Sequence, residues 1–131
     1  MEKVAWKPGT MIYPLPAVMV SCGGNPADNN IITVSWTGTI CTDPAMCYIS
    51  VRPERHSYGL IRKYGDFVIN LTTARLAYAT DWCGVKSGRD FNKFAEMKLT
   101  PAPASIVKAP LIKESPVNIE CTVEEIKELG T

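Results

Sequence analysis

Short hydrophobic runs, rich in β-branched and aromatic residues, recur along the chain, and clusters of turn-forming residues separate them. The runs predict strands at 17–22, 31–36, 46–51, 67–71 and 117–129. Gly38 is expected to interrupt the second strand, which then resumes at 40–41. Glycine at such a place indicates a bulge or a close approach of backbone to a ligand.

Two stretches show helical spacing of apolar residues instead, and they predict helices at 58–64 and 74–83. Ser57 and Thr73 precede these stretches and are expected to be their N-caps. The segment 101–116 contains four prolines and is expected to form an extended surface connection.

Strands outnumber helices in this pattern, which favours a mainly β fold with helical insertions, in one domain of 131 residues. Residues 129–131 resemble the start of a hairpin turn, so the preceding strand would lack its next neighbour. An exposed strand edge invites pairing with another chain. We therefore expect either that a second subunit covers this edge or that the chain is a shortened version of a longer protein.

Composition is that of an ordinary globular protein, with 46% hydrophobic and 21% charged residues. The formal net charge is +1, and Lys and Arg do not gather along the chain, so we expect no nucleic-acid surface. One small basic group, Arg52, Arg55 and His56, fits a single phosphate better than a polymer.

Five cysteines are present without a CxxC pair, which argues against zinc fingers and dithiol redox motifs and favours reduced core cysteines. The N-terminus has no signal-peptide core. The apolar stretch 11–20 contains Pro14 and Pro16 and is too short to cross a bilayer. We expect a soluble, cytoplasmic protein without membrane contact.

The sequence contains no GxSxG, P-loop or GxGxxG motif, and His56 is its single histidine. The informative segments are four polar patches near strand ends, at 29–36, 40–44, 50–57 and 83–94. In the first patch, backbone amides and Trp36 would suit a flat heterocycle, although an amphipathic strand with a core tryptophan explains it as well. In the second, Cys41 would border a reactive edge or simply pack in the core.

The patch at 50–57 joins a strand to a helix N-terminus, where free N–H groups and the helix dipole favour an anion. Arg52 or Arg55 would add a charge-assisted contact, or both would be solvated. In the patch at 83–94, backbone N–H groups at Ser87 and the Lys93 ammonium would face a ligand, or the segment is an ordinary surface turn. The sequence pattern leaves both alternatives open.

These patches, in this order, resemble the flavin reductase-like family, and flavoredoxins in particular. The matching pieces are 16–18, 30–36, 50–53, 67–71, 83–84, 87–90, 93–94, 109–110 and 119–121. The resemblance implies an FMN-binding split β-barrel of Greek-key type, assembled as a homodimer. Family members usually continue beyond residue 131, so we expect this chain to lack the C-terminal part of the barrel.

By the same resemblance, Trp36 and Asn30 would lie at the flavin, Ser57 at its phosphate and Lys93 near its ring. The expected flavin contacts are Asn30, Thr33, Val34, Ser35, Trp36, Cys41, Ser50, Arg52, His56, Ser57, Ser87 and Lys93. The implied activity is that of an oxidoreductase passing electrons from NAD(P)H or a protein donor through FMN to an acceptor. The alternatives are a flavin-binding electron carrier without enzymatic turnover and a cofactor-free interaction subunit.

Overall fold

Eight short strands and four helices form the structure, a computed structural model that describes residues 1–131. The strands are β1 (Val18–Cys22), β2 (Asn30–Val34), β3 (Thr37–Cys41), β4 (Met46–Ile49), β5 (Asp66–Asn70), β6 (Pro101–Ala102), β7 (Leu111–Ile112) and β8 (Asn118–Thr122). The helices are α1 (His56–Tyr64), the 3₁₀ turn η1 (Ala74–Leu76), α2 (Ala77–Val85) and α3 (Lys93–Glu96). The chain is therefore mainly β with helical insertions, as predicted.

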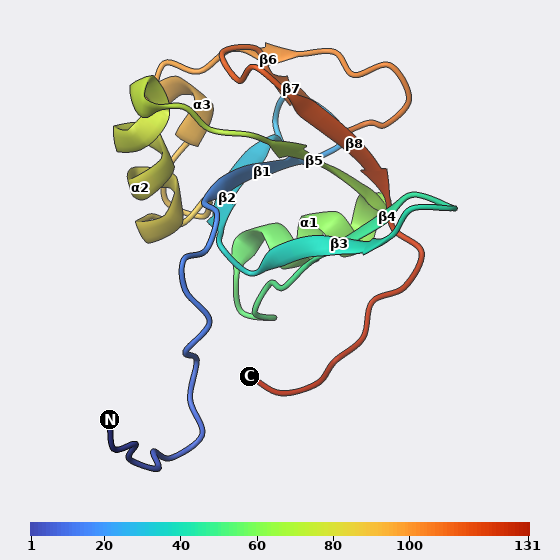
Figure 1. Ribbon diagram of the computed structural model, residues 1–131. Helices are drawn as coiled ribbons and strands as arrows, with labels where there is room; N and C mark the ends of the chain where they lie inside the picture. The colour runs from blue at the N-terminus through green and yellow to red at the C-terminus, as the bar shows by residue number, and fades with distance from the viewer.

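An antiparallel sheet of four strands, in the order β2-β1-β5-β8, forms the centre of the fold (Figure 1). In its register, Val20 of β1 pairs with Ile32 of β2 on one side and with Ile69 of β5 on the other. Strands β3 and β4 form a separate two-stranded sheet, and β6 and β7 form a third.

Because side chains alternate along a strand, β1 supplies both faces of this sheet. On the first face, Val18 and Val20 join a buried cluster that Ile61 of α1 completes. On the second face, Met19 packs in another cluster with residues of η1, α2 and α3. Figure 1 shows the matching arrangement, with α2 and α3 together on one side of the sheet and α1 near β3 and β4.

The predicted strand at 31–36 with a break at Gly38 is wrong in its details. β2 ends at Val34, and β3 begins at Thr37 in a different sheet, so the chain leaves the central sheet at Ser35–Trp36. Gly38 instead lies inside β3, where an added Cβ would come 3.0 Å from the Tyr48 ring of β4. The glycine accommodates a cross-strand aromatic side chain and does not interrupt the strand.

One of the two predicted N-caps is wrong, and the other is correct in position only. The N-cap of α1 is Arg55, and no side chain caps this terminus, while Ser57 lies inside the helix. Thr73 stands at the N-cap of η1 but makes no capping hydrogen bond. The last strand ends at Thr122 and not at 129, and the segment 101–116 contributes the short β6 and β7 ladder besides its extended parts. None of the helices combines the length and the apolar character needed to span a bilayer.

Candidate functional site

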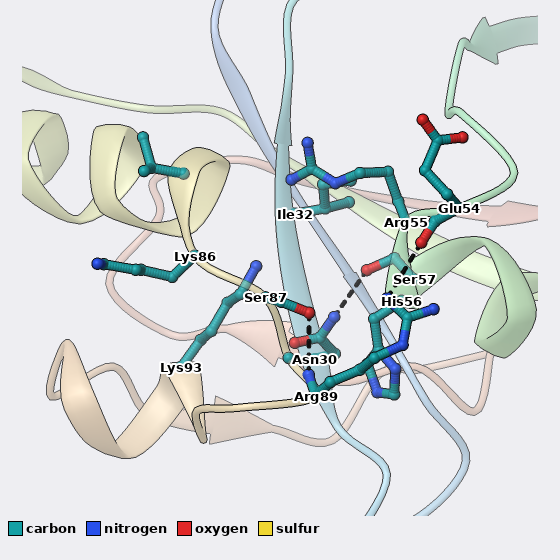
Figure 2. Close-up of a pocket in the computed structure, with 12 residues that line it drawn as sticks. Asn30, Ile32, Glu54, Arg55, His56, Ser57, Lys86, Ser87, Arg89 and Lys93 are labelled. Carbon is teal, nitrogen blue, oxygen red and sulfur yellow. Dashed lines mark hydrogen bonds between the residues drawn. The ribbon is translucent and has the colours of Figure 1, made fainter. Parts of the chain in front are cut away.

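A cavity of about 250 Å³ opens beside the start of β2, between the N-terminus of α1 and the segment that follows α2 (Figure 2). Its lining is mostly polar, with only two hydrophobic residues among twelve. The lining residues are Asn30, Ile32, Glu54, Arg55, His56, Ser57, Val85, Lys86, Ser87, Gly88, Arg89 and Lys93. A cavity of this character suits a polar or charged group better than an apolar one.

Buried polar side chains from two elements meet at the base of this cavity. Asn30, the first residue of β2, donates a hydrogen bond from Nδ2 to the Ser57 hydroxyl over 2.8 Å, and both residues are buried. Gly88 lies against Asn30 and His56, because an added Cβ would overlap Oδ1 of Asn30 and lie 2.7 Å from Cδ2 of His56. Only glycine therefore lets the segment after α2 approach so closely.

Lys93, the first residue of α3, is almost completely buried, at 2% exposure. Its Nζ donates hydrogen bonds to the carbonyl oxygens of Ile31 and Cys83, each over 2.7 Å. An ammonium has three hydrogens, so one remains for a group in the cavity that Lys93 lines. Burial lowers the pKa of Lys93 to about 8, and at neutral pH the side chain is still mainly charged.

Basic residues dominate the charge of the cavity. Its lining includes four cationic residues, Arg55, Lys86, Arg89 and Lys93, and one acidic residue, Glu54. Burial lowers the pKa of His56, and the charges of Arg89 and Lys93 lower it further, so this imidazole is neutral at neutral pH. Four cations against one anion, in a partly enclosed space, favour an anionic ligand.

Two arginines tie the walls of the cavity together in opposite directions. Arg55, at the N-terminus of α1, donates from NH2 to the carbonyl oxygen of Gly84 in α2, over 3.0 Å. Arg89, on the opposite wall, donates from NH1 to the carbonyl oxygen of Glu54 over 3.1 Å, and its own backbone N–H is bound by Ser87 Oγ. These two reciprocal hydrogen bonds hold the walls of the cavity together.

Five of the twelve predicted contacts line this one cavity: Asn30, His56, Ser57, Ser87 and Lys93. They come from parts of the chain up to 63 positions apart, from 30 to 93. The fold therefore brings together three of the four polar patches found in the sequence.

The other seven predicted contacts lie outside the cavity: Thr33, Val34, Ser35, Trp36, Cys41, Ser50 and Arg52. Thr33 donates from Oγ1 to the Thr80 carbonyl of α2 over 2.5 Å, and Val34 is buried in the first cluster. Trp36 is half exposed, and Arg52 forms a solvent-exposed ion pair with Glu54. Contact of these seven with a flavin stays a prediction.

Glu54, Lys86 and Arg89 also line the cavity, and no role was predicted for them from the sequence. A signal was available for Arg89, because it directly follows the Ser87–Gly88 pair that was expected near a ligand. The direction of a long side chain depends on the packed fold, so the sequence alone does not show that Arg89 reaches the cavity.

Comparison with known proteins agrees with this architecture. A family model described as the flavin reductase like domain matches residues 10–131. An uncharacterized protein from Pyrococcus abyssi is 32% identical over 120 residues, which are 92% of this chain and 68% of that protein.

Among solved structures, flavoredoxin of Desulfovibrio vulgaris (Miyazaki F) is 30% identical, with a TM-score of 0.89 over 96% of this chain and 69% of that one. A Shewanella frigidimarina protein with a split barrel domain is 23% identical, with a TM-score of 0.80 over 88% of this chain and 58% of that one. The chain spans about two thirds of the length of the Pyrococcus and Desulfovibrio proteins. The fold is thus the split β-barrel, and the chain belongs to the flavin reductase-like family.

Proposed function

We propose that the basic cavity binds FMN and that the chain works as an FMN-dependent oxidoreductase. The observation that carries this proposal is the convergence of Arg55, Arg89 and Lys93 on one cavity at an uncapped helix N-terminus. A helix N-terminus favours an anion, and arginine binds phosphate oxygens with paired N–H donors. Membership of a flavin reductase-like family identifies the class of ligand as a flavin.

The cavity is large enough for one end of FMN and not for the whole ligand. Small-molecule sites usually measure about 300–1,000 Å³, and this cavity, at about 250 Å³, would hold only part of a flavin. Ser57 and the two arginines would hold the phosphate. Lys93 would direct its remaining N–H toward the isoalloxazine, where positive charge stabilises the reduced form.

The rest of the isoalloxazine would then lie outside the cavity, against surfaces that one chain leaves open. Trp36 is half exposed at the junction of β2 and β3, and the sequence resemblance implies a flavin site close to a subunit interface. We therefore propose that a homodimer completes the site, in the cytoplasm, with Trp36 beside the ring.

When bound, FMN supplies the hydride- and electron-accepting chemistry. The chain's own residues bind and orient it. Asn30 and Ser57 fix each other by their buried hydrogen bond, and the reciprocal contacts of Arg55 and Arg89 set the width of the cavity. No residue of the cavity is needed as a general acid for hydride transfer, so we assign no catalytic residue.

Arg89→Ala tests the phosphate assignment. Loss of one charge-assisted contact, about 1.5–3 kcal/mol, should weaken FMN binding by about 10–100-fold in a fluorescence titration. Arg62→Ala is the matched control, because Arg62 lies on α1 in an exposed pairing with Glu128, away from the cavity. Equal FMN affinity in the two variants would remove Arg89 from the phosphate site.

Two other functions remain as alternatives. Anaerobic reduction separates the oxidoreductase from an electron carrier, and addition of FMN identifies a cofactor-free subunit. We expect NADH or NADPH in stoichiometric amount to bleach the flavin absorption of the FMN-loaded protein rapidly. Slow or absent bleaching, with reduction by a protein donor, would instead identify an electron carrier. A colourless protein that gains neither absorbance nor thermal protection from added FMN would be a cofactor-free interaction subunit.

A further inference from the structure

Two cysteines meet on the side of the fold formed by strands β4 and β8. The Sγ atoms of Cys47 in β4 and Cys121 in β8 are 3.7 Å apart, although the residues are 74 positions apart in sequence. No backbone ladder joins β4 to β8, since β8 is an edge of the four-stranded sheet and β4 belongs to the separate pair with β3. The thiol contact therefore bridges two sheets that share no ladder of backbone hydrogen bonds.

Both thiols are half-buried and pack against the apolar cluster of the first sheet face. Neither residue lines the basic cavity, so the site proposed for FMN gives them no role. The structure contains no group of three or more His, Cys, Asp or Glu side chains able to hold a metal ion. Two thiols in contact can still undergo one covalent reaction with each other.

We propose that Cys47 and Cys121 form a thiol–disulfide site, which low-molecular-weight disulfides such as oxidised glutathione close into an intrachain bond. A disulfide has an S–S length of about 2.04 Å, so the two Sγ atoms, now 3.7 Å apart, would approach by about 1.7 Å.

The reaction proceeds by two exchange steps. In the first, one cysteine loses its proton and its sulfur attacks oxidised glutathione, forming a mixed disulfide and releasing one glutathione, which takes up a proton. In the second, the other cysteine loses its proton, attacks the protein sulfur of the mixed disulfide and releases the second glutathione. Two electrons pass from the cysteine pair to the oxidant, and both protons end on the released glutathione.

Burial and the contact with Cys47 together raise the pKa of the Cys121 thiol to about 12. Because the thiolate is the attacking species, closure of the bond is expected to be faster at higher pH. Either cysteine can carry the mixed disulfide, because the second exchange step gives the same Cys47–Cys121 bond.

The bond would link the two sheets and close a long loop of chain. Such a link removes conformations from the unfolded state, and the model for this effect predicts more stabilisation for longer loops. The melting temperature of the oxidised chain is expected to rise by roughly 5–15 °C. The pair would thus make the stability of the barrel depend on the thiol–disulfide balance around it.

The test uses the full chain, with and without FMN, incubated with excess oxidised glutathione at low protein concentration. We expect an intact mass lower by two hydrogens, a mapped Cys47–Cys121 peptide, and three of the five cysteines left free for alkylation after denaturation. Cys47→Ser and Cys121→Ser should each abolish the link. Cys41→Ser is the control that should retain it, because Cys41 contacts the Pro44 carbonyl and no second thiol.

Three results would overturn the proposal. These are glutathione adducts without the Cys47–Cys121 link, a disulfide between two chains in its place, and a mapped link with a melting temperature that does not rise. The mapping is carried out on the wild-type chain, so the conclusion does not depend on whether either serine variant folds.

Discussion

The two faces of the four-stranded sheet bury clusters of equal size but different character. The first face carries eight apolar residues from β1, β2, β5 and α1. The second face also carries eight, but the almost completely buried Lys93 and Asn70 lie beside it. The first face holds one neutral polar pair at its edge, Asn30 and Ser57, which hydrogen-bond to each other. The second face holds a buried charge, the Lys93 ammonium, which burial makes unfavourable unless it is hydrogen-bonded.

The buried polar side chains of the second face form hydrogen bonds with backbone carbonyl oxygens and N–H groups of neighbouring segments. Asn70 donates from Nδ2 to the Met19 carbonyl over 2.9 Å and accepts at Oδ1 from the Ile112 backbone N–H over 3.1 Å. Lys93 donates to two carbonyl oxygens and keeps one hydrogen for the cavity. The first face thus supplies most of the apolar core and the neutral Asn30–Ser57 pair, and the second face also places a buried charge at the cavity.

The largest expected effect tests the first face. Ile69 in β5 is 4% exposed in the first cluster, and Ile69→Ala should lower the free energy of unfolding by about 2–5 kcal/mol. FMN affinity of the folded protein should change little, because Ile69 does not line the cavity. Urea unfolding and FMN titration under native conditions measure the two quantities. A large loss of affinity in the folded variant would erase the distinction between the faces.

A smaller effect is expected on the second face. Lys93→Met removes the buried ammonium while keeping an unbranched side chain, so FMN affinity should fall by about 10–100-fold. Lys63→Met is the matched control, because Lys63 is exposed on α1, 3.8 Å from Asp28. Fluorescence titration compares the variants, and circular dichroism checks that both fold. Wild-type affinity in Lys93→Met would remove Lys93 from the site.

Two further effects concern pH, and the first is a change in FMN affinity. Because the pKa of Lys93 is lowered to about 8, its positive charge is lost as pH rises from 7 to 9. FMN affinity should then fall by roughly 5–10-fold in the wild type and less in Lys93→Met. Titrations at pH 7, 8 and 9 measure this difference. The same pH dependence in both proteins would show that another group titrates.

Stability should respond to the same titration with the opposite sign. The pKa of Lys93 is lowered from 10.5 on folding, so between pH 8 and 10.5 the unfolded chain binds the proton and the folded chain does not. Unfolding free energy should therefore rise with pH in this window, by about 1–3 kcal/mol relative to Lys93→Met. The positive charge of Lys93 thus lowers the unfolding free energy of the ligand-free protein and raises its affinity for FMN.

Parts of the fold with strong local signals were predictable from the sequence. The run at 17–22 became β1, and Gly65 ends α1 in the left-handed region with φ of 76°, as a glycine after a helix commonly does. The break after Val34 was not predictable from local pattern, because it depends on β3 pairing with β4 in another sheet. Gly38 was a misleading signal, because its missing side chain makes room for the Tyr48 ring and does not break the strand.

The family pattern predicted several residues of the site, but not the hydrogen bonds by which two arginines join its walls. Ser57 and Lys93 follow from the family pattern and do line the cavity. Arg89 and Arg55 reach across between segments about 30 positions apart, to the Glu54 and Gly84 carbonyls, and only the packed segments show that reach. Arg52, named from the same basic group, turns to solvent and pairs with Glu54.

The most direct test of the central claim, that the basic cavity holds the phosphate of a flavin, compares FMN with riboflavin on the wild-type chain. Riboflavin has the same ring and sugar alcohol but no phosphate. Fluorescence titrations in one buffer should give a dissociation constant at least about 10-fold lower for FMN, from the charge-assisted contacts of the phosphate. Equal affinity for the two flavins would contradict the account.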